Sequence, residues 1–513
     1  MAEAAAVAAE ASPVVATASR TCQHVVNDIQ MSPGDKRNWR KVMRKTKVIC
    51  TIGPASDNEE TLRKLIEEGM AVARLNFSHG THEEHKKKFD LIKKVRADLR
   101  QPIAIMLDTK GPEYRIGCFE NGSITLEDGD TFTFTTEEMM GTQEKVSVSY
   151  KNLIDNLEIG DRILVNNGLV IFEVTELKEK EAVCKCLAGG VLSDKKSMNF
   201  PNKVLDQPFL SEQDKKDLLF GIQNGADYVA ASFVSCKQDV QDMRDFLDQN
   251  GGKDVEIIAK IENRSGVENI EDICQLSDGI MIARGDLGVE IPGVEVPSAQ
   301  KFLISKCRML GVRVITATEM LESMIKNPRP TRAEISDVAN AVYDGTSAVM
   351  LSGETASGKY PVQALKTMVE TIEYTETKIN YKKRFRNADF EVRSTLDAVS
   401  HTVCTMAIDV GAKCIIVNSL SGRTARMVSR FRCPVDIIGM TTSAKVWRKL
   451  NLSWGLTPVM CGMFDSMEEM FRNSVLEAES AMGLEKGDNV VITGGITNGT
   501  SGNTNLIKVE EII

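Results

Sequence analysis

The chain has 513 residues, of which 42% are hydrophobic and 26% are charged. This composition is typical of a globular protein of about three domains. The formal net charge of −9 lacks the basic surplus of nucleic-acid-binding proteins, and no apolar stretch approaches the roughly 20 residues that span a membrane. We therefore expect a cytoplasmic protein with no nucleic-acid or membrane partner.

The first part of the chain differs from the rest. Its first 20 residues are rich in alanine and carry Glu3 and Glu10 without the basic segment of a secretory signal. We expect residues 1–43 to form a disordered N-terminal extension. The 12 cysteines are scattered through the chain without a C-x-x-C pair, a distribution that favours free thiols in a reducing compartment.

From residue 44, eight short apolar runs recur, with helical patterns such as 59–70 and 298–311 between most of them. A nearly continuous apolar run of this length is typical of a parallel strand buried on both faces. Eight such strands alternating with helices predict a (β/α)8 TIM barrel over residues 44–111 and 209–384. The predicted strands are 47–53, 72–78, 103–109, 228–234, 256–262, 279–285, 312–318 and 347–353.

Residues 112–208 interrupt this rhythm between the third and fourth strands. Segments 123–136, 162–176 and 181–190 alternate polar and apolar residues around turn sequences, which predicts β-hairpins and a small all-β domain. The insertion leaves the barrel at the C-terminal end of the third strand, where barrel active sites lie, so we expect a lid. Residues 385–513 predict a C-terminal α/β domain with a central, mostly parallel sheet.

Polar side chains gather where the second and third strands end. Arg74, Asn76 and Ser78 are spaced by two and share one face of the second strand. The third strand ends at Asp108 and Thr109, so carboxylate, hydroxyl, amide and backbone oxygens would meet at one rim. Such an oxygen cage suits a weakly hydrated monovalent cation better than zinc. Polar residues that merely solvate the barrel rim are an equally good interpretation of these residues alone.

The fifth and sixth strands end with charged residues. Lys260 and Glu262 share a face of the fifth strand, and Asp286 follows the sixth. Two carboxylates at one rim would form a magnesium site completed by water and substrate oxygens. A lysine beside that cation and a phosphoryl group would stabilise spreading negative charge. An inter-strand salt bridge is the competing interpretation, and these residues alone do not outweigh it.

The seventh and eighth strands end with hydroxyls, at Thr318 and Ser352 respectively. Hydroxyls at this rim could orient a water that donates a proton. Capping of the following helix is the stronger interpretation of each hydroxyl taken singly.

A histidine-rich segment follows the second strand. Thr81 and Glu84 fit a capping box that begins a helix. We therefore expect His82 and His85 to face solvent rather than to bind zinc. Only His79, which is nearest the rim, remains a functional candidate.

The whole pattern resembles the pyruvate kinase family over residues 44–513. Long motifs in the family's order carry this resemblance: TKVICTIGPAS (46–56), ARLNFSHGTHE (73–83), MLDTKGPEYR (106–115), AKIENRSGVENI (259–270), DGIMIARGDLGVEI (278–291), TATEMLESM (316–324), PRPTRAEISDVANAV (328–342) and VMLSGETASGKYP (349–361). The resemblance implies transfer of the phosphoryl group of phosphoenolpyruvate to ADP, giving pyruvate and ATP in the last step of glycolysis. It also implies Mg²⁺ (or Mn²⁺) and K⁺ as cofactors, and a homotetramer.

The resemblance further implies roles for individual residues. Lys260 stabilises the transferring phosphoryl group and the forming enolate, while Thr318 and Ser352 serve the protonation of that enolate. The other implied sets are the catalytic and phosphoryl-contacting Arg74; the substrate contacts Arg74, Lys260, Gly285, Asp286 and Thr318; the divalent-metal ligands Glu262 and Asp286; the potassium ligands Asn76, Ser78, Asp108 and Thr109; and the nucleotide contacts Asn76, His79, Arg115 and Lys196.

The sequence departs from the family pattern at several positions. Asn166 and Asn167 stand where the family usually has two aspartates, so the lid's nucleotide contact loses two carboxylates. Asn202 replaces a usual glycine of the lid, and Glu319 replaces a common glutamine beside the pocket. Some family members carry a lysine that takes over the task of potassium, and Glu113 occupies that position here. This glutamate implies the potassium-dependent form of the site.

One loop of the C-terminal domain resembles the family's effector loop. SLSGRTAR (419–426) follows a predicted strand and opens a helix, which gathers backbone N–H groups and hydroxyls around an anion. Leu420 stands where some fructose-bisphosphate-activated members carry lysine, so we expect a sugar monophosphate or a nucleotide first and fructose bisphosphate second. The implied effector residues are Ser419, Ser421, Gly422, Arg423 and Thr424.

Two other functions fit parts of this pattern. A magnesium-dependent carbon–carbon lyase that acts on pyruvate enolate would need the two carboxylates but not the insertion or Lys260. A non-catalytic metabolite sensor on the same fold would be expected to lack Lys260, Glu262 or Asp286, and all three are present. Formation of ATP from ADP and phosphoenolpyruvate, with and without potassium, separates these functions.

Overall fold

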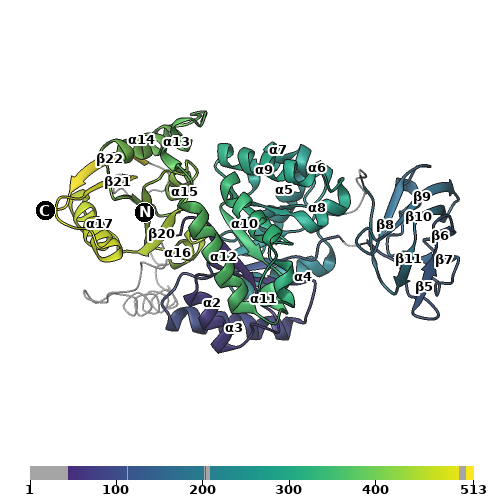
Figure 1. The fold of residues 1–513 in the computed structure, drawn as a ribbon. Coiled ribbons are helices and arrows are strands. Elements are labelled where there is room, and N and C mark those ends of the chain that lie inside the picture. The colour runs from purple at the N-terminus through teal and green to yellow at the C-terminus, as the bar shows by residue number, and fades with distance from the viewer. Residues whose placement is uncertain (1–43, 113, 202, 204–207, 496–503) are drawn as a thin grey trace, which may run out of the picture.

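The computed structural model describes residues 44–112, 114–201, 203, 208–495 and 504–513. The predicted extension over residues 1–43 lies outside this range. Figure 1 shows three bodies in a row: the β-rich insertion, a central barrel wrapped in helices, and the C-terminal domain. The insertion and the C-terminal domain thus stand at opposite ends of the barrel.

A closed barrel of eight parallel strands forms the centre of the molecule, in the order β1, β17, β16, β15, β14, β13, β3, β2. Every strand residue is buried except the last residue of β2, because aliphatic side chains fill both the barrel interior and the layer beneath the helices. All eight predicted strands are confirmed. Their bounds are β1 Lys47–Thr51, β2 Val72–Asn76, β3 Ala104–Asp108, β13 Tyr228–Ala231, β14 Glu256–Ile261, β15 Gly279–Ala283, β16 Arg313–Ala317 and β17 Ala348–Leu351.

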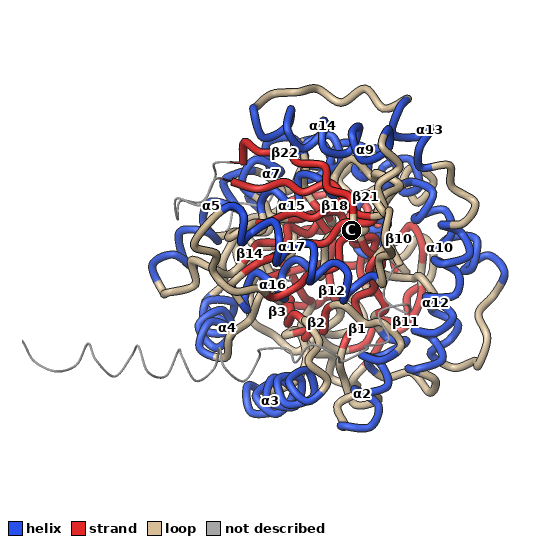
Figure 2. The backbone as a smooth tube through the Cα atoms, turned by 90° about the vertical axis from the view of Figure 1, so that its left-hand side faces the viewer, coloured by secondary structure: helices blue, strands red, loops and turns tan. Residues whose placement is uncertain are grey.

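Helices ring the barrel, as Figure 2 shows from the side of the C-terminal domain. Several begin at capping boxes, including the one predicted from Thr81 and Glu84 at the start of α3. The helices are α2 Glu59–Glu67, α3 His82–Asp98, α4 Glu212–Gln223, α5 Lys237–Gln249, α6 Arg264–Glu268, α7 Ile270–Leu276, α8 Arg284–Glu290, α9 Val296–Leu310, α10 Arg332–Asp344, α11 Gly353–Ala356 and α12 Pro361–Glu376, with a 3₁₀ turn η3 at Glu322–Ile325.

The insertion is an all-β domain, as predicted, with one seven-stranded sheet, one two-stranded sheet and its own aromatic core. The hairpin predicted at 162–176 is confirmed, because β8 and β9 pair as antiparallel neighbours. Its elements are β4 Tyr114–Arg115, β5 Ser123–Leu126, β6 Thr131–Thr135, β7 Lys145–Ser147, η2 Ile154–Asn156, β8 Arg162–Val165, β9 Val170–Leu177, β10 Glu181–Ala188, β11 Gly190–Ser193 and β12 Ser197–Asn199.

The hairpin predicted at 123–136 is wrong. Its two strands form, but β5 pairs with β11 and β6 pairs with β10. The turn between them is fastened to a third strand, since the N–H of Gly129 donates to the carbonyl of Cys186 in β10. This pairing depends on contacts distant in sequence, which a local alternation pattern does not contain.

The C-terminal domain contains a five-stranded sheet in the order β20, β19, β18, β21, β22. The first four strands are parallel and β22 is antiparallel to β21, so the predicted mostly parallel sheet is confirmed. Its elements are α13 Tyr381–Arg386, α14 Thr395–Asp409, β18 Cys414–Asn418, α15 Arg423–Ser429, β19 Asp436–Thr441, α16 Ala444–Leu450, β20 Leu456–Met460, α17 Met467–Met482, β21 Asn489–Gly495 and β22 Thr504–Glu511.

A buried charge network joins this domain to the N-terminal ends of the barrel strands. Glu256, the first residue of β14, forms ion pairs with Arg313 of β16 and, at 3.2 Å, with Arg426 of α15. Arg448 of α16 lies 2.8 Å from Asp227, which precedes β13. The opposite, C-terminal ends of the same strands are therefore left open toward the insertion.

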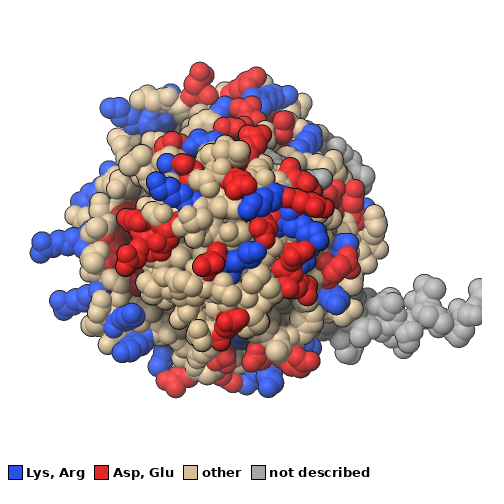
Figure 3. Space-filling model, turned by 90° about the vertical axis from the view of Figure 1, so that its right-hand side faces the viewer, with Lys and Arg blue, Asp and Glu red and all other residues tan. Residues whose placement is uncertain are grey.

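The distribution of charge on the surface agrees with a composition that contains both acidic and basic residues in quantity. Acidic and basic side chains intermingle over the face at the lid end of the molecule, which Figure 3 shows. Among the described helices, none combines the length and apolar character that a membrane span requires. The described cysteines are all free thiols, and Cys184 and Cys186 share the buried face of β10.

Candidate active site

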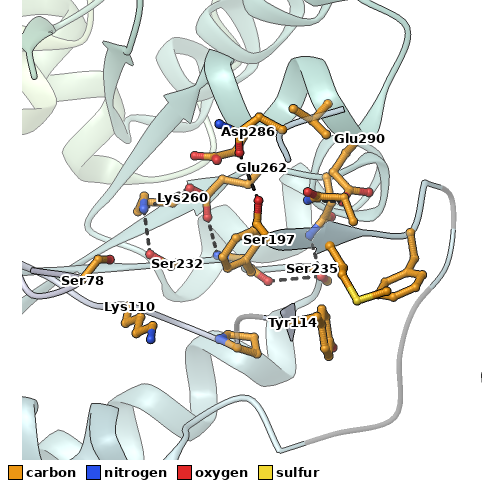
Figure 4. A pocket seen from close by; sticks show the side chains of 18 of the residues that line it. Ser78, Lys110, Tyr114, Ser197, Ser232, Ser235, Lys260, Glu262, Asp286 and Glu290 are labelled. Atoms are coloured by element: carbon orange, nitrogen blue, oxygen red, sulfur yellow. Dashed lines mark hydrogen bonds and ion pairs between the residues drawn. The ribbon is translucent and has the colours of Figure 1, made fainter. Parts of the chain in front are cut away.

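A cavity of about 880 Å³ opens at the C-terminal rim of the barrel, between the strand ends and the insertion. Figure 4 shows the side chains that point into it from both bodies. The cavity brings together nine of the predicted site residues: Arg74, Asn76, Ser78, His79, Arg115, Lys196, Lys260, Glu262 and Asp286.

Lys260 is the centre of the charged part of this cavity. Its ammonium lies 2.7 Å from Ser232 Oγ, 3.0 Å from Glu262 Oε1 and 3.1 Å from Asp108 Oδ1, and its side chain is buried. Burial by itself would lower the pKa of Lys260, but the carboxylates of Asp108 and Glu262 raise it above the ordinary value. The ammonium is therefore permanently charged and held at one point.

Asp108 lies between two cations. Its carboxylate is 2.6 Å from Nε of Arg74 and 3.1 Å from Nζ of Lys260, and it is fully buried. Burial raises the pKa of Asp108, but the charges of Arg74 and Lys260 outweigh this and lower it. Arg74 also donates from Nη1 to the hydroxyl of Thr51 at 2.9 Å, which fixes its guanidinium against the rim.

Glu262 and Asp286 differ sharply in exposure. Glu262 is buried, with Oε2 accepting from the N–H of Phe233 at 2.6 Å, whereas Asp286 is exposed at the rim. Oε1 of Glu262 is in ion-pair distance of Lys260 but accepts no well-aligned hydrogen bond. Burial and the nearby Asp286 raise the pKa of Glu262 to about 7, against the opposing effect of Lys260. Figure 4 shows Asp286 and Glu262 on the same wall of the cavity.

These two carboxylates fit a hard divalent cation. Oε1 of Glu262 accepts no well-aligned hydrogen bond although it lies 3.0 Å from the Lys260 ammonium, and the exposed Asp286 leaves the remaining coordination positions open to water and substrate oxygens. Within the described part of the chain, no cluster of three or more histidine, cysteine, aspartate or glutamate residues could enclose a metal by itself.

The predicted potassium ligands also lie together. Asn76 and Asp108 are directly paired across β2 and β3, and Oδ1 of Asn76 accepts from the N–H of Ser78 at 3.1 Å. The carbonyl oxygen of Thr109 accepts from Ser232 Oγ at 2.7 Å. Since Asp108 already pairs with two cations, neutral oxygens dominate this group, and neutral oxygens suit a weakly hydrated monovalent ion.

Thr318 and Ser352 lie outside the residues that line the cavity. The hydroxyl of Thr318 accepts from the N–H of Gly285 at 2.7 Å and donates to Ala317 at 2.6 Å. Both Thr318 and Glu319 have positive φ angles, 66° and 53°. A β-branched residue in this region is strained, and such strain is concentrated at functional sites.

Ser352 precedes α11, but its hydroxyl caps no N–H group of that helix. Its Oγ is buried and has no hydrogen-bond partner among the described residues. The capping interpretation is therefore wrong for this side chain. An unpartnered buried hydroxyl behind the barrel rim remains available for a proton route.

The nucleotide candidates come from the lid side of the cavity. β4 pairs with β12, which places Arg115 opposite Ser197 and next to Lys196. Asn166 and Asn167 both adopt positive φ in the turn before β9, and the side-chain oxygen of Asn167 accepts from Ser197 Oγ at 3.1 Å. The asparagines thus form a neutral turn in the wall of the cavity.

The three clustered histidines lie differently from the prediction. His79 is exposed at the cavity, as expected, but His85 is buried and its ring stacks on Phe77 at a centroid distance of 3.9 Å. His82 is partly buried and lies 2.6 Å from Asp217 of α4. The expected exposure of His85 is wrong, because it occupies the inward face of α3 together with Phe89.

Two contacts of the cavity were not predicted from the sequence. Ser232, within an apolar run, bridges Lys260 and Thr109. Asn199 of the lid donates to Glu290 of the barrel at 2.9 Å. Ser232 is a single hydroxyl at the end of a predicted strand, which by itself does not indicate a site. The contact between Asn199 and Glu290 depends on how the lid and the barrel are placed relative to each other.

The candidate effector residues lie in the C-terminal domain, between β18 and α15. Gly422 has a φ of 76° and precedes α15, a short helix that begins at Arg423. The hydroxyls of Thr424 and Thr504 lie 2.6 Å apart.

Two positions at which the sequence departs from the family pattern, Glu113 and Asn202, lie outside the described residues.

Comparisons with known proteins agree with this arrangement. The family descriptions "Pyruvate kinase, barrel domain" and "Pyruvate kinase, alpha/beta domain" match residues 43–365 and 397–510. Pyruvate kinase of Clostridium acetobutylicum is 45% identical over 92% of this chain and 100% of its own length. That of Geobacillus stearothermophilus is 46% identical over 91% of this chain and 80% of its own length.

A solved structure gives the same result for the fold. The crystal structure of a pyruvate kinase from Cryptosporidium parvum superposes with a TM-score of 0.87 at 39% identity, over 92% of this chain and 97% of the other. The matches run through the barrel, the lid and the C-terminal domain alike, and this chain belongs to the pyruvate kinase family.

Proposed function

We propose that this chain transfers the phosphoryl group of phosphoenolpyruvate to ADP at the C-terminal rim of the barrel, with Lys260 as the charge-stabilising residue. The observation that carries the proposal is the position of the ammonium, which is buried among Asp108, Glu262 and Ser232 and lines the cavity. A cation fixed in a water-poor site stabilises developing negative charge more strongly than one in bulk water.

The reaction has two steps. A β-phosphate oxygen of ADP bonds to phosphorus as the bond from phosphorus to the enol oxygen breaks, which leaves ATP and the enolate of pyruvate. Arg74 and Lys260 orient the phosphoryl group and neutralise its charge during this transfer. The enolate then takes a proton at its methylene carbon and becomes pyruvate. Thr318 fixes the proton-donating water on this face, and Ser352 continues the proton route behind it.

Glu262 and Asp286 would hold the divalent cation, Mg²⁺ or Mn²⁺. When bound, this ion supplies Lewis-acid stabilisation of the phosphoryl charge. Asn76, Ser78, Asp108 and Thr109 would hold K⁺ beside the same phosphoryl group. The buried Oε1 of Glu262, which accepts no well-aligned hydrogen bond, supports the first assignment, and the mainly neutral oxygens around Asp108 support the second.

The nucleotide binds on the lid side of the cavity. Arg115, Lys196 and His79 supply donors to its phosphates, with Asn76 at the barrel end. Gly285 and Asp286 complete the substrate contacts at the start of α8. The neutral turn at Asn166 and Asn167 favours hydrogen bonds over charge in the lid contact.

Regulation through the loop at 419–424 is a further part of the proposal. A phosphorylated effector would be bound by Ser419, Ser421, Gly422, Arg423 and Thr424. We propose a sugar monophosphate or a nucleotide rather than fructose bisphosphate, because Leu420 is apolar and partly exposed in this loop. We also propose a homotetramer that acts in the cytoplasm.

A coupled assay tests the central proposal. Purified protein should form ATP from ADP and phosphoenolpyruvate, with magnesium present and with potassium either present or replaced by tetramethylammonium. Asp286→Ala should weaken Mn²⁺ binding, measured by titration without substrate, and should abolish turnover at ordinary metal levels. Pyruvate enolate chemistry without ATP formation would instead favour a lyase, and unchanged Mn²⁺ binding would show that Asp286 is structural.

A further inference from the structure

Four neighbouring barrel strands, β13, β14, β15 and β16, carry the proposed active site at one end and contact the C-terminal domain at the other. Figure 1 shows α15 and α16 on the side of this domain that faces the barrel. At the ends that face the domain, the strands begin with, or are directly preceded by, Tyr228, Glu256, Asp278 and Arg313. Tyr228, Glu256 and Arg313 are buried, and buried charges require partners.

Glu256 is the centre of this group. Its carboxylate forms an ion pair with Arg313 and lies 3.2 Å from Nη1 of Arg426 and 3.4 Å from Nζ of Lys449. Burial by itself raises the pKa of this carboxyl group, but the three surrounding cations outweigh burial and lower the pKa. Glu256 is therefore a fixed negative charge at neutral pH.

Hydrogen bonds extend this group to the other three strands. Nη1 of Arg313 donates to the hydroxyl of Tyr228 at 2.9 Å, and this hydroxyl donates to the carbonyl of Lys449 at 2.5 Å. Nε of Arg313 donates to the carbonyl of Asp278 at 3.2 Å. One connected network thus holds the beginnings of the four strands against α15 and α16.

One layer of side chains separates this network from the active site. Residues of β14 that are spaced by two share a face, so Glu256, Ile258 and Lys260 point in the same direction. Ile258 belongs to the apolar cluster inside the barrel, together with Met281 and Ile315. Close-packed interiors contain few voids and therefore transmit displacements. A shift of Glu256 thus reaches Lys260 through a single packed layer.

Arg426 connects the network to the loop at 419–424. Its backbone N–H donates to the carbonyl of Gly422 at 3.0 Å, in the first turn of α15. Gly422 has a φ of 76° and lies so close to α16 that a Cβ atom there would come within 3.0 Å of Val446 and Leu450. A change in the conformation of the loop therefore moves α15, and with it the guanidinium of Arg426.

The guanidinium of Arg426 is shared between two strands. Its Nη1 lies 3.2 Å from Oε1 of Glu256 at the start of β14 and 3.2 Å from Oδ1 of Asp278 just before β15. Both distances exceed the roughly 2.7–2.9 Å of a well-formed charge-assisted hydrogen bond. A small movement of α15 can thus shorten one contact at the expense of the other.

A junction that only holds the two domains together is the competing interpretation. Other ion pairs serve that purpose, such as Lys45 with Asp436 at 2.5 Å and Arg448 with Asp227 at 2.8 Å. Neither of these two pairs includes a residue of α15 or of the loop. Arg426 differs from them, because its own backbone is hydrogen-bonded to the loop.

We propose that Arg426 is the positioning residue through which a phosphorylated ligand in the loop at 419–424 changes the affinity of the barrel rim for phosphoenolpyruvate. This inference rests on the proposed effector site and on the proposed reaction. Ligand binding moves the loop and α15, and Arg426 redistributes its contact between β14 and β15. Lys260, Glu262 and Asp286, at the opposite ends of these two strands, are the groups proposed to bind the phosphoryl group and the divalent cation.

Isothermal titration calorimetry of the full-length protein tests this coupling. Ribose 5-phosphate and AMP are the probes, and each is titrated with and without phosphoenolpyruvate in a buffer that contains magnesium and potassium but no ADP, so that no turnover occurs. Binding that Ser421→Asp abolishes is assigned to the loop. Because coupling between two sites is reciprocal, the ratio of the two Kd values measures it directly, and in the wild type this ratio should be about fivefold or more.

Arg426→Gln should keep the binding and lose the coupling. The probe still binds, because Arg426 is not among the residues proposed to contact it, but the Kd ratio should fall below about twofold. Arg426→Lys should retain part of the ratio, because it keeps the charge. Asp278→Asn tests the same contact from the barrel side and should also lower the ratio, since it removes one of the two acceptors and leaves Glu256 in place.

Lys45→Gln is the matched control. It removes an ion pair between the same two domains, but one that joins Lys45 to Asp436 of β19 rather than to a residue of α15. The Tm of Lys45→Gln and of Arg426→Gln should fall by similar amounts, while only Arg426→Gln loses the Kd ratio. Equal loss of the ratio in both variants would show that any loosening of the junction has this effect, and would overturn the proposal.

The remaining outcomes separate this inference from the proposals on which it rests. Probe binding with a ratio near one in the wild type, or with an unchanged ratio in Arg426→Gln, would refute the inference alone. No binding of either probe at the loop would refute the effector site, and no binding of phosphoenolpyruvate would refute the reaction. The inference falls with each of these two.

Discussion

The hydroxyl of Ser232 accepts a hydrogen bond from the ammonium of Lys260 at 2.7 Å. The same oxygen lies 2.7 Å from the carbonyl of Thr109 and 3.4 Å from the carboxylate of Asp108, so its single proton goes to Thr109. One hydroxyl thus joins the proposed phosphoryl-stabilising cation to a proposed ligand of potassium. The Lys260 ammonium and the Thr109 carbonyl are therefore positioned by the same hydroxyl group.

Ser232→Ala should therefore affect both functions together. Loss of a hydrogen bond to a charged group corresponds to about 1.5–3 kcal/mol, so we expect kcat to fall about tenfold or more. The apparent activation constant for potassium should rise in the same variant, while the KM for ADP changes little. Ser232→Thr should restore part of kcat, because it keeps the hydroxyl.

Ser235→Ala is the matched control for this experiment. Ser235 lines the same cavity, but its hydroxyl bonds to Phe233 and Asn263 rather than to Lys260 or Thr109. A potassium activation constant that is identical in Ser232→Ala and the wild type would show that Ser232 has only a packing role.

Lys260→Met should reduce turnover by about 10³-fold or more and leave the fold intact, because it removes charge stabilisation that acts mainly in the transition state. Steady-state kinetics of the purified variant, with circular dichroism to verify folding, provides the measurement. Lys359→Met, at an exposed position after the eighth barrel strand, should behave like the wild type. Turnover of Lys260→Met within a few-fold of the wild type would exclude the proposed role.

The fold was largely predictable because the barrel strands are locally encoded. Each is a continuous apolar run, and both of its faces are buried, so the run itself identifies the strand. The pairing of β5 with β11 was not predictable in this way, because it joins residues as distant in sequence as Ser123 and Ser193 and is set by the tertiary structure. The position of His85 was predictable in principle, since it is four residues before Phe89 on the same face of α3.

Only those residues of the site that lie at the ends of the barrel strands could be predicted from the sequence. Lys260 and Glu262 lie at the end of β14, and Asp286 lies just after the neighbouring strand β15, so sequence order places them at one rim. Ser232 gave no comparable signal, because one serine in an apolar run is commonplace. The contact between Asn199 and Glu290 joins two domains whose relative placement no local pattern specifies.

That contact predicts a pH-dependent attachment of the lid. Burial raises the pKa of Glu290, the hydrogen bond from Asn199 opposes this, and the nearby charge of Asp286 adds to it. A carboxyl group whose folded-state pKa is raised stabilises the folded protein below its unfolded value, and this contribution is lost as pH rises through the folded-state pKa. The Tm of the wild type should therefore fall relative to that of Glu290→Gln as pH rises from about 4.5.

Breaking the same contact should loosen the lid. Asn199→Ala removes a hydrogen bond worth about 1 kcal/mol, so the KM for ADP should rise roughly fivefold with little change in kcat. Asn152→Ala, which lies elsewhere in the lid and does not line the cavity, serves as the control. An unchanged KM for ADP in Asn199→Ala would mean that the contact does not hold the lid in its nucleotide-binding position.

The last prediction concerns potassium. The group formed by Asn76, Ser78, Asp108 and Thr109 contains one formal negative charge, and that charge is shared with Arg74 and Lys260. A site of mainly neutral oxygens cannot displace tightly held water, so we expect activity with potassium and little with sodium, which is smaller and more strongly hydrated.

Activity should be measured at constant ionic strength while tetramethylammonium replaces potassium, and potassium alone should raise the Tm in the absence of substrate. Glu113→Lys, at a position outside the described residues, should lower the potassium requirement at some cost in turnover, because an ammonium group would replace the bound cation. Full activity of the wild type in tetramethylammonium would remove the functional case for this group of oxygens. It would leave Asp108 with the role that its two ion pairs already define, which is to hold Arg74 and Lys260 at the rim.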